Sequence, residues 1–236
     1  MAASGFPSGN YRPTMEAFLL AGVGGCIDAI GLLTLGGLFV SHMSGNTAAM
    51  GAFLGQGHWS AGWPHLFAVP VFVMGLFAGY LVLADTPSYQ RCAWVLLSEA
   101  LLLAVFSLIL LWTGSPAINT PAYFLLASLP LLAMGMQNAT LRQVGRSVFP
   151  STYVTGVLDM LARSAAEFWK ERGRSGAAAK RTTAIGAAGI WTCYALGAMG
   201  GAAGLLVFRL GIMVLPVVIL VSLAWRFFRI TDQPRS

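Results

Sequence analysis

The chain has very few charged residues. Asp, Glu, Lys and Arg make up 9% of its 236 residues, whereas hydrophobic residues make up 57%; soluble globular domains carry roughly 25% charged residues. A shortage of this size means that most of the surface does not face water. Several apolar runs of about 20 residues match the roughly 30 Å hydrocarbon core of a bilayer. The sequence therefore predicts an all-α membrane protein with several spans, whose partner is the lipid bilayer.

Cysteine and the common catalytic motifs are also scarce or missing. Cys26, Cys92 and Cys193 each stand alone in an apolar run, without the spacing of a metal site. The sequence contains no HExxH, GxSxG or phosphate-binding loop. The absence of a phosphate-binding loop argues against a self-contained ATP-driven pump. We expect no enzymatic activity, no metal and no cofactor.

The apolar runs predict six membrane spans and two shorter helices. The predicted spans cover residues 15–40, 64–84, 92–112, 122–141, 182–208 and 210–228. Two further segments, 43–57 and 151–169, predict re-entrant or interfacial half-helices, because the first is too short to cross a bilayer and the second is amphipathic. We expect a disordered tail at 1–14 and a cytoplasmic tail at 229–236.

The distribution of basic residues predicts the orientation. The net charge of +6 is confined to a few loops, so we interpret it as a topology signal and expect no nucleic-acid partner. Eight of the 14 basic residues fall within 142–181, and among the predicted outer segments only Arg209 is basic. A basic loop of this kind favours the cytoplasmic side. We therefore expect both termini to be cytoplasmic.

Two stretches of the chain are weakly similar. Gly25-Cys26-Ile27-Asp28-Ala29 aligns with Gly135-Met136-Gln137-Asn138-Ala139, and with one inserted residue Ser44-Gly45 falls on Thr155-Gly156. Each half, 15–112 and 122–228, would then contain three spans and one half-helix. Because three is odd, the two halves would be inverted in the membrane, as in many secondary transporters. Chance similarity between two Gly/Ala-rich helices is the alternative.

Asp28 is the main candidate for a functional residue. An ionised carboxylate deep in a membrane span costs about 2.5–3.5 kcal/mol on insertion scales unless it is paired or solvated. It would be a proton- or cation-coupling acid or a solute contact; the alternative is a helix–helix hydrogen bond to Asn138 or Gln137. Glu99 is a second intramembrane acid, which would line the cavity or pair across helices.

Polar residues at the two half-helices complete the candidate site. Free N–H groups at a half-helix N-terminus attract anionic groups, although ordinary N-capping by Ser44 or Asn46 with a turn at Gly45 would also explain the first cluster. The predicted solute- or ion-binding set is Asp28, Ser41, His42, Ser44, Gly45, Asn46, Thr47, Glu99, Gln137, Asn138, Thr152, Tyr153, Thr155 and Gly156.

A glycine stripe marks the fifth predicted span. Its members follow one helix face at helical spacing, and they are Gly197, Gly200, Gly201 and Gly204. Small residues spaced in this way let another helix approach closely. The stripe would pack inside the monomer or form the seam of a homodimer.

Three strings in the sequence resemble a known family. GCIDAIGLLTLGGLFVSHMSGNT, AMGMQNATLRQVG and STYVTG are similar to the YoaK family of bacterial membrane proteins, also called domain of unknown function 1275. The resemblance extends from about Glu16 to Phe228. Family members often have Thr at the position of Ser44, and TTYVTGTL where this chain has Ser151 and Val157. The resemblance implies a multi-pass protein of the bacterial inner membrane and supplies no substrate.

The sequence thus favours a secondary transporter or facilitator of a small solute, with a midplane site between inverted repeats. A non-transporting membrane scaffold or sensor, acting through its glycine stripes and basic loop, is the alternative. An intramembrane enzyme is a weaker third hypothesis, because only isolated polar residues are present.

Overall fold

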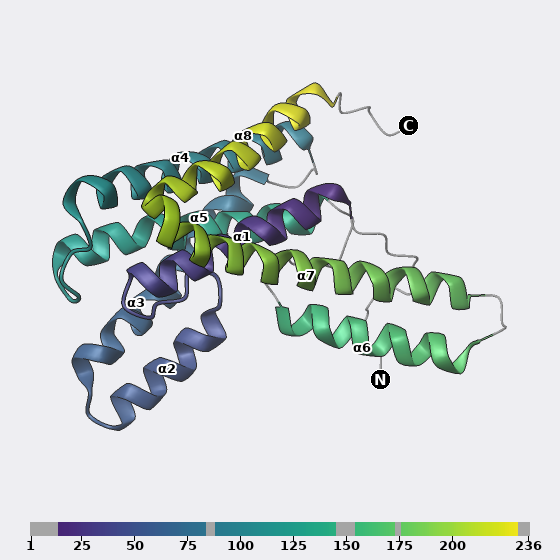
Figure 1. Ribbon diagram of the computed structural model, residues 1–236, viewed down its shortest axis with the longest axis horizontal. Coiled ribbons are helices and arrows are strands. Elements are labelled where there is room, and N and C mark those ends of the chain that lie inside the picture. The colour runs from purple at the N-terminus through teal and green to yellow at the C-terminus, as the bar shows by residue number, and fades with distance from the viewer. Residues whose placement is uncertain (1–13, 84–87, 145–153, 173–175, 231–236) are drawn as a thin grey trace.

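The computed structural model describes residues 14–83, 88–144, 154–172 and 176–230, and all the regular secondary structure in this part is helical (Figure 1). The helices in chain order are α1 (Met15–Thr34), α2 (Met43–Gly55), α3 (Trp59–Leu83), α4 (Tyr89–Thr113), α5 (Pro121–Val144), α6 (Val154–Lys170), α7 (Ala177–Phe208), the 3-10 helix η1 (Arg209–Met213) and α8 (Val214–Arg229). Five stretches are long and apolar enough to cross a membrane; the fifth spans Ala177–Arg229 and includes α7, η1 and α8. The chain is therefore a membrane-embedded, all-helical protein, as predicted.

Helix α1 is shorter than the predicted first span. It ends at Thr34 instead of residue 40, because Gly36 and Gly37 adopt positive φ values of 66° and 90°, which favour glycine and stop a right-handed helix. The following linker, residues 35–42, runs back along α1. A Cβ built on Gly31 would lie 2.8 Å from the Val40 side chain. Because of these glycines, the last part of the predicted span is a non-helical linker that packs against α1.

Three helices start four or five residues away from the start of the predicted span. Helix α3 starts at Trp59, five residues before the predicted start at 64, and contains Pro64 and Pro70 in its interior, which membrane helices tolerate because neighbouring groups satisfy the freed carbonyl groups. Helix α7 starts at Ala177 instead of 182, so the basic residues Lys180 and Arg181 lie on a helix and not in a loop. Helix α8 starts at Val214 instead of 210, after η1.

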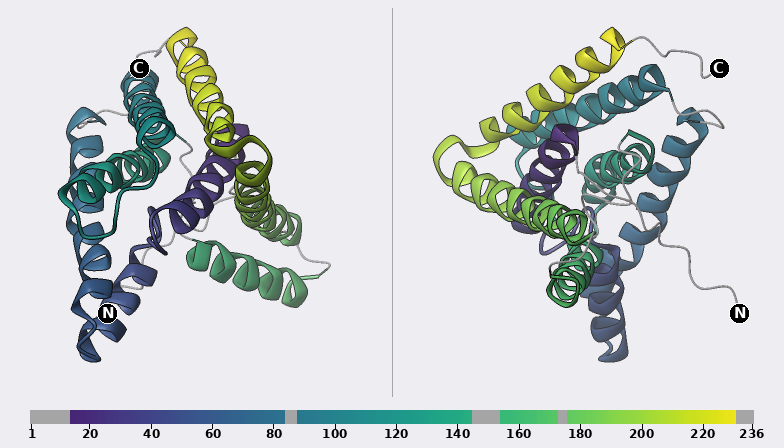
Figure 2. Two further views of the ribbon diagram at one scale, coloured as in Figure 1. Left: turned by 60° about the vertical axis from the view of Figure 1, so that its left-hand side comes forward. Right: turned by 90° about the vertical axis from the view of Figure 1, so that its right-hand side faces the viewer.

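The chain reverses direction between α7 and α8. Arg209 has a positive φ of 52°, a conformation that is rare for residues other than glycine and interrupts the helix. Figure 1 and the right-hand view of Figure 2 show α8 turning back from the end of α7 to run beside α4. The Ser107 hydroxyl of α4 donates a hydrogen bond to the Leu210 carbonyl in this turn (3.3 Å).

Glycines set the two main helix crossings. Where α1 crosses α7, a Cβ on Gly25 would overlap the carbonyl oxygen of Tyr194, and a Cβ on Gly197 would overlap that of Gly22. Where α3 crosses α5, a Cβ on Gly135 would overlap the carbonyl oxygen of Phe72. Such backbone-to-backbone contact is available only to glycine and is typical of tightly packed membrane helices.

The glycine stripe of α7 is largely used inside the chain. Besides Gly197, a Cβ on Gly201 would lie 2.8 Å from the Cys26 carbonyl oxygen, and one on Gly204 would lie 2.5 Å from Ile212. Within the described residues, a Cβ on Gly200 would have nothing within 4 Å. The stripe therefore packs within the monomer, as the first of the two predicted roles requires, and the homodimer seam stays a prediction.

The short helices form two hairpins that leave the central helices in different directions. Helix α2 packs on α3, and α6 packs on α7; Figures 1 and 2 show these pairs projecting on separate sides of the molecule. Large apolar side chains cover the outside of the long helices, including Trp112 (88% exposed) and Leu206 (87% exposed). Such a surface is stable against lipid and not against water.

Candidate functional site

Asp28 is the centre of a buried polar cluster. Only 4% of its surface is exposed. The backbone N–H groups of Val40 and Ser41 donate to its Oδ1 (3.0 and 2.8 Å). The hydroxyls of Ser41 and Tyr194 donate to Oδ2, the latter at 2.7 Å, and His42 Nδ1 lies 2.8 Å from the same oxygen. An ionised carboxylate only accepts hydrogen bonds, so this ring of donors fits its charged form.

The linker brings these donors to Asp28. Because the chain turns at Gly36 and Gly37, Val40, Ser41 and His42 return to the level of Asp28 instead of continuing away from it on a helix. The Tyr123 hydroxyl of α5 donates to the Leu35 carbonyl (2.9 Å) and holds the start of the linker. The cluster thus joins α1 and the linker that follows it to Tyr194 on α7, which is distant in sequence.

His42 is the part of the cluster nearest to the outside. Its side chain is 27% exposed, against 5% for that of Asp28. Its ring stands edge-on between Phe39 and Tyr194, at centroid distances of 6.1 and 5.5 Å. One nitrogen therefore faces the buried carboxylate while part of the ring stays accessible.

Tyr194 is a cluster member that the sequence pattern does not predict. It lies on α7, and its hydroxyl links α7 to Asp28 of α1. The local signal was weak: it is a tyrosine in an apolar run, three residues before Gly197 of the stripe. Its position at the glycine crossing, where Gly25 contacts its carbonyl oxygen, determines that its side chain reaches Asp28.

The SGNT segment is the first turn of α2 and not a glycine-broken turn. Helix α2 starts at Met43, and no side chain caps it, so the predicted N-capping by Ser44 or Asn46 is wrong. Gly45 packs against the Phe39 ring (3.1 Å for a built Cβ). Ser44 and Thr47 are exposed, and the Thr47 hydroxyl donates back to the Met43 carbonyl (2.8 Å).

Asn46 has a structural role that was not predicted. It is fully buried, its amide oxygen accepts from the Phe39 N–H (3.2 Å), and its amide group donates to the Phe39 carbonyl (2.6 Å). His65 Nδ1 of α3 lies 3.0 Å from the same amide oxygen. One side chain therefore fixes the linker, α2 and α3 together.

We expect Asn46→Ala to lower the free energy of unfolding by about 1–3 kcal/mol, because it leaves the part-buried Phe39 N–H and carbonyl without a partner and opens a cavity at a buried position. Thermal unfolding in detergent measures the loss. Thr47→Ala, one residue away and exposed, is the control and should change stability by less than about 0.5 kcal/mol. Equal losses for the two variants would contradict the structural role of Asn46.

The predicted residues of the second half do not join the Asp28 cluster. The Gln137 amide group donates to the Leu20 carbonyl of α1 (3.1 Å), two helical turns from Asp28, and that of Asn138 donates to the Met134 carbonyl (3.2 Å). The alternative in which Asp28 bonds to Asn138 or Gln137 is replaced by the contacts of Asp28 with the linker and Tyr194.

The half-helix residues of the second half are only partly described. Thr155 and Gly156 lie in the first turn of α6, where Thr155 is exposed. Thr152 and Tyr153 lie outside the described residues. The described part of α6 therefore places no polar side chain against Asp28.

Glu99 is buried on α4, away from the Asp28 cluster. It is 0% exposed, and neither carboxyl oxygen has a hydrogen-bond partner among the described residues. The Gln137 amide oxygen on the neighbouring helix α5 is also buried without a partner there. A buried polar atom without a partner is costly, so both groups are candidates for contact with a solute.

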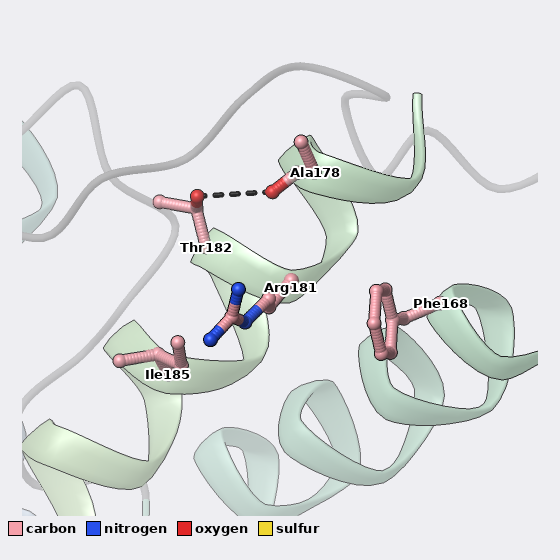
Figure 3. A pocket seen from close by; sticks show the side chains of 5 residues that line it. All are labelled: Phe168, Ala178, Arg181, Thr182 and Ile185. Carbon is pink, nitrogen blue, oxygen red and sulfur yellow. Dashed lines mark hydrogen bonds between the residues drawn. The ribbon is translucent and has the colours of Figure 1, made fainter. Parts of the chain in front are cut away.

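Two surface cavities of about 430 Å³ lie elsewhere. One, between α6 and α7, is lined by Phe168, Ala178, Arg181, Thr182 and Ile185; Figure 3 shows the Arg181 guanidinium on α7 and the Phe168 ring on α6. The second is lined by residues of α1, α4, α7, η1 and their loops, including Thr34 and Arg209. Neither cavity is lined by Asp28 or His42, and the cluster is closed at Asp28, which is buried.

Comparison with known proteins is consistent with the geometry. The family model described as "Protein of unknown function (DUF1275)" matches residues 17–225. The UPF0700 transmembrane protein YoaK of Bacillus subtilis (strain 168) is 28% identical over 156 residues, which are 64% of this chain and 66% of that relative. No solved structure matches the chain significantly.

The family match extends from the start of α1 into α8 and includes every described member of the Asp28 cluster. It therefore confirms the resemblance found in the sequence strings. The chain belongs to the DUF1275 family of multi-pass membrane proteins.

Proposed function

We propose that the chain is a secondary transporter or facilitator of a small solute, built from two inverted three-span repeats with its site between them. The observation that carries this proposal is the Asp28 cluster. A carboxylate buried in a membrane helix is costly and usually functional. This one is bound by groups from both halves of the chain, α1 and its linker in the first and Tyr194 in the second.

The two glycine crossings support the repeat. Gly22 and Gly25 of α1 correspond to Leu132 and Gly135 of α5 by one constant shift in sequence. The corresponding residues make equivalent contacts. A Cβ on Gly197 of α7 would overlap the Gly22 carbonyl of α1, and a Cβ on Gly75 of α3 would overlap the Leu132 carbonyl of α5. These contacts at matched positions favour a repeat over chance similarity of two glycine-rich helices.

The pairing of helices supports the same symmetry. If α1–α4 correspond in order to α5–α8, the α1–α7 contact corresponds to α5–α3, and the α2–α3 contact corresponds to α6–α7. All four contacts are present. The α4–α8 contact converts into itself, as expected if these two helices lie beside the symmetry axis. Inverted repeats related in this way are common in secondary transporters.

The α7–α8 reversal supports six spans. A straight helix of the length of Ala177–Arg229 would measure roughly 80 Å at 1.5 Å per residue, far more than a bilayer core of about 30 Å. Because the chain reverses at Arg209, we assign two crossings to this stretch. With six spans and the basic segment around α6 on the cytoplasmic side, both termini would lie in the cytoplasm of a bacterial inner-membrane protein.

The closed cluster suggests how the site would open. Asp28 and Tyr194 connect α1 to α7 at the glycine crossing, so a movement of one half against the other must break this hydrogen bond. The closed state then corresponds to one end of an alternating-access cycle. In the open state, the Asp28 carboxylate and the unpaired amide oxygen of Gln137 would be available to the solute.

The scaffold or sensor alternative depends on surfaces that another protein could bind. The glycine stripe, its main candidate, is largely used within the chain, which weakens that alternative. It would gain support if purified protein bound no small molecule while pulling down a defined membrane partner.

The test of transport is a thermal-shift screen of a metabolite library on purified protein, followed by uptake into proteoliposomes. We expect a stabilising compound to be taken up, and Asp28→Asn to reduce its uptake roughly tenfold or more, about the effect of losing one charge-assisted contact of 1.4 kcal/mol. Asp159→Asn, an exposed acid on α6 that pairs with Arg163, is the control. Uptake unchanged by Asp28→Asn would remove Asp28 from the mechanism.

A further inference from the structure

We propose that the ion coupled to solute movement is a proton, exchanged between His42 and Asp28, and not a metal cation; the inference rests on the proposed transport function. The juxtaposition of one buried carboxylate with one partly exposed imidazole carries it. His42 Nδ1 lies 2.8 Å from Asp28 Oδ2, within the range over which a proton passes directly between a base and an acid.

The surroundings of Asp28 are wrong for an alkali or alkaline-earth cation. Such hard cations need several oxygen acceptors around them. Asp28 Oδ1 instead faces the backbone N–H groups of Val40 and Ser41, whose positive ends would repel a cation and which cannot turn into acceptors. One of the two carboxylate oxygens is therefore closed to a metal cation.

The other carboxylate oxygen is surrounded by groups that can adapt to a proton. The hydroxyls of Ser41 and Tyr194 donate to Oδ2, and a hydroxyl can change from donor to acceptor by rotating. When His42 in its imidazolium form gives its Nδ1 proton to Oδ2, the products are a neutral imidazole and a carboxylic acid, and no other species is needed. The same atoms return the proton in the reverse step.

Exposure and charge both indicate that a proton reaches Asp28 through His42. It is the partly exposed member of the pair. The group that faces the pair from a neighbouring helix is the weakly acidic hydroxyl of Tyr194 on α7. The neutral Gln137 amide of α5 contacts α1 at Leu20, two turns from Asp28. The Glu16–Arg226 ion pair between α1 and α8 lies twelve residues from Asp28, roughly 18 Å along the helix.

Protonation would couple to the movement of the helices. The Tyr194–Asp28 hydrogen bond joins α1 to α7, and it is charge-assisted only while Asp28 is ionised. A proton on Asp28 weakens this connection and favours the opened state. Because Asn138 holds the matching position in the second half and cannot titrate, the site would carry one proton per cycle.

The experiment is an infrared pH titration of the purified full-length protein in lipid, in a Glu99→Gln background that removes the fully buried acid on α4. We expect a buried carboxyl C=O band that appears on acidification and is absent from Asp28→Asn. Exchanging NaCl for choline chloride at constant ionic strength should leave the band and the thermal midpoint unchanged. A thermal midpoint that rises with Na⁺ or Ca²⁺ in the parent protein and not in Asp28→Asn would overturn the proposal.

Two further variants keep the test decisive if Asp28→Asn does not fold. Tyr194→Phe removes one donor to the ionised form, so it should move the midpoint of the band to higher pH; a band that does not respond would contradict the assignment to Asp28. His42→Gln should retain the band and slow its hydrogen–deuterium exchange at least several-fold. Unchanged exchange would remove His42 as the entrance.

The outcomes distinguish failure of this inference from failure of the transport proposal. If the Asp28 band titrates but no library compound is taken up under a pH gradient, the proton site stands and transport falls. If a compound is taken up and its accumulation follows a Na⁺ gradient and not a pH gradient, transport stands and the proton falls.

Discussion

Adding one methyl group at Gly197 is expected to destabilise the protein by about 1–3 kcal/mol, the usual cost of overpacking a tight interface. The Cβ of Gly197→Ala would overlap the carbonyl oxygen of Gly22. Since backbone lies on both sides, no side chain can rotate away, and only a separation of α1 from α7 relieves the clash. That separation also stretches the Tyr194–Asp28 hydrogen bond, which lies at the same crossing.

Gly200→Ala is the matched control, because it adds the same group to the same helix. Within the described residues, nothing lies within 4 Å of a Cβ built there, and alanine is favoured over glycine in a helix by up to about 1 kcal/mol. We expect no loss of stability and a small gain. Thermal and denaturant unfolding in a fixed detergent compare the two. If Gly200→Ala were the more damaging, position 200 would be the contact surface, as in a homodimer.

The repeat extends this prediction to the other crossing. Gly75→Ala should destabilise the protein to a similar extent, because its Cβ would overlap the Leu132 carbonyl oxygen. Similar losses at Gly75 and Gly197 are expected from symmetric halves. A tolerated alanine at Gly75 beside a damaging one at Gly197 would show that the two crossings are not equivalent.

Asp28→Ala is expected to lower the free energy of unfolding by about 3–5 kcal/mol. It leaves the N–H groups of Val40 and Ser41 and the Tyr194 hydroxyl without their acceptor in a buried site, and each unsatisfied group costs about 1–3 kcal/mol before relaxation. The linker should then detach from α1. Limited proteolysis at residues 35–42, together with thermal unfolding, measures both effects.

Two comparisons separate this effect from a simple loss of charge. Asp28→Asn keeps an oxygen acceptor for the two backbone N–H groups, so it should cost less than the alanine variant. Asp159→Ala removes an acid that is exposed and paired with Arg163, and should cost less than about 0.5 kcal/mol. An Asp28→Ala protein as stable as Asp159→Ala would mean that the linker is held by other contacts.

The sequence alone determined the class of the protein. Long apolar runs with few charges predict membrane helices, because burial in lipid depends on local composition alone. The same reasoning placed the short helix α2 at 43–57, where the structure has Met43–Gly55, and identified Asp28 as the residue most in need of partners. The strings around Asp28 and Asn138 also gave the family, which the family model confirms.

Only the tertiary structure decided which groups meet Asp28. Its hydroxyl partner Tyr194 is 166 residues away in sequence, and no periodicity relates the two. Asp28 and Tyr194 meet because glycines at the α1–α7 crossing let the two backbones touch. The linker donors reach Asp28 because Gly36 and Gly37 fold the linker back along α1. Local composition predicts that a buried acid needs donors, but the crossing of distant helices selects them.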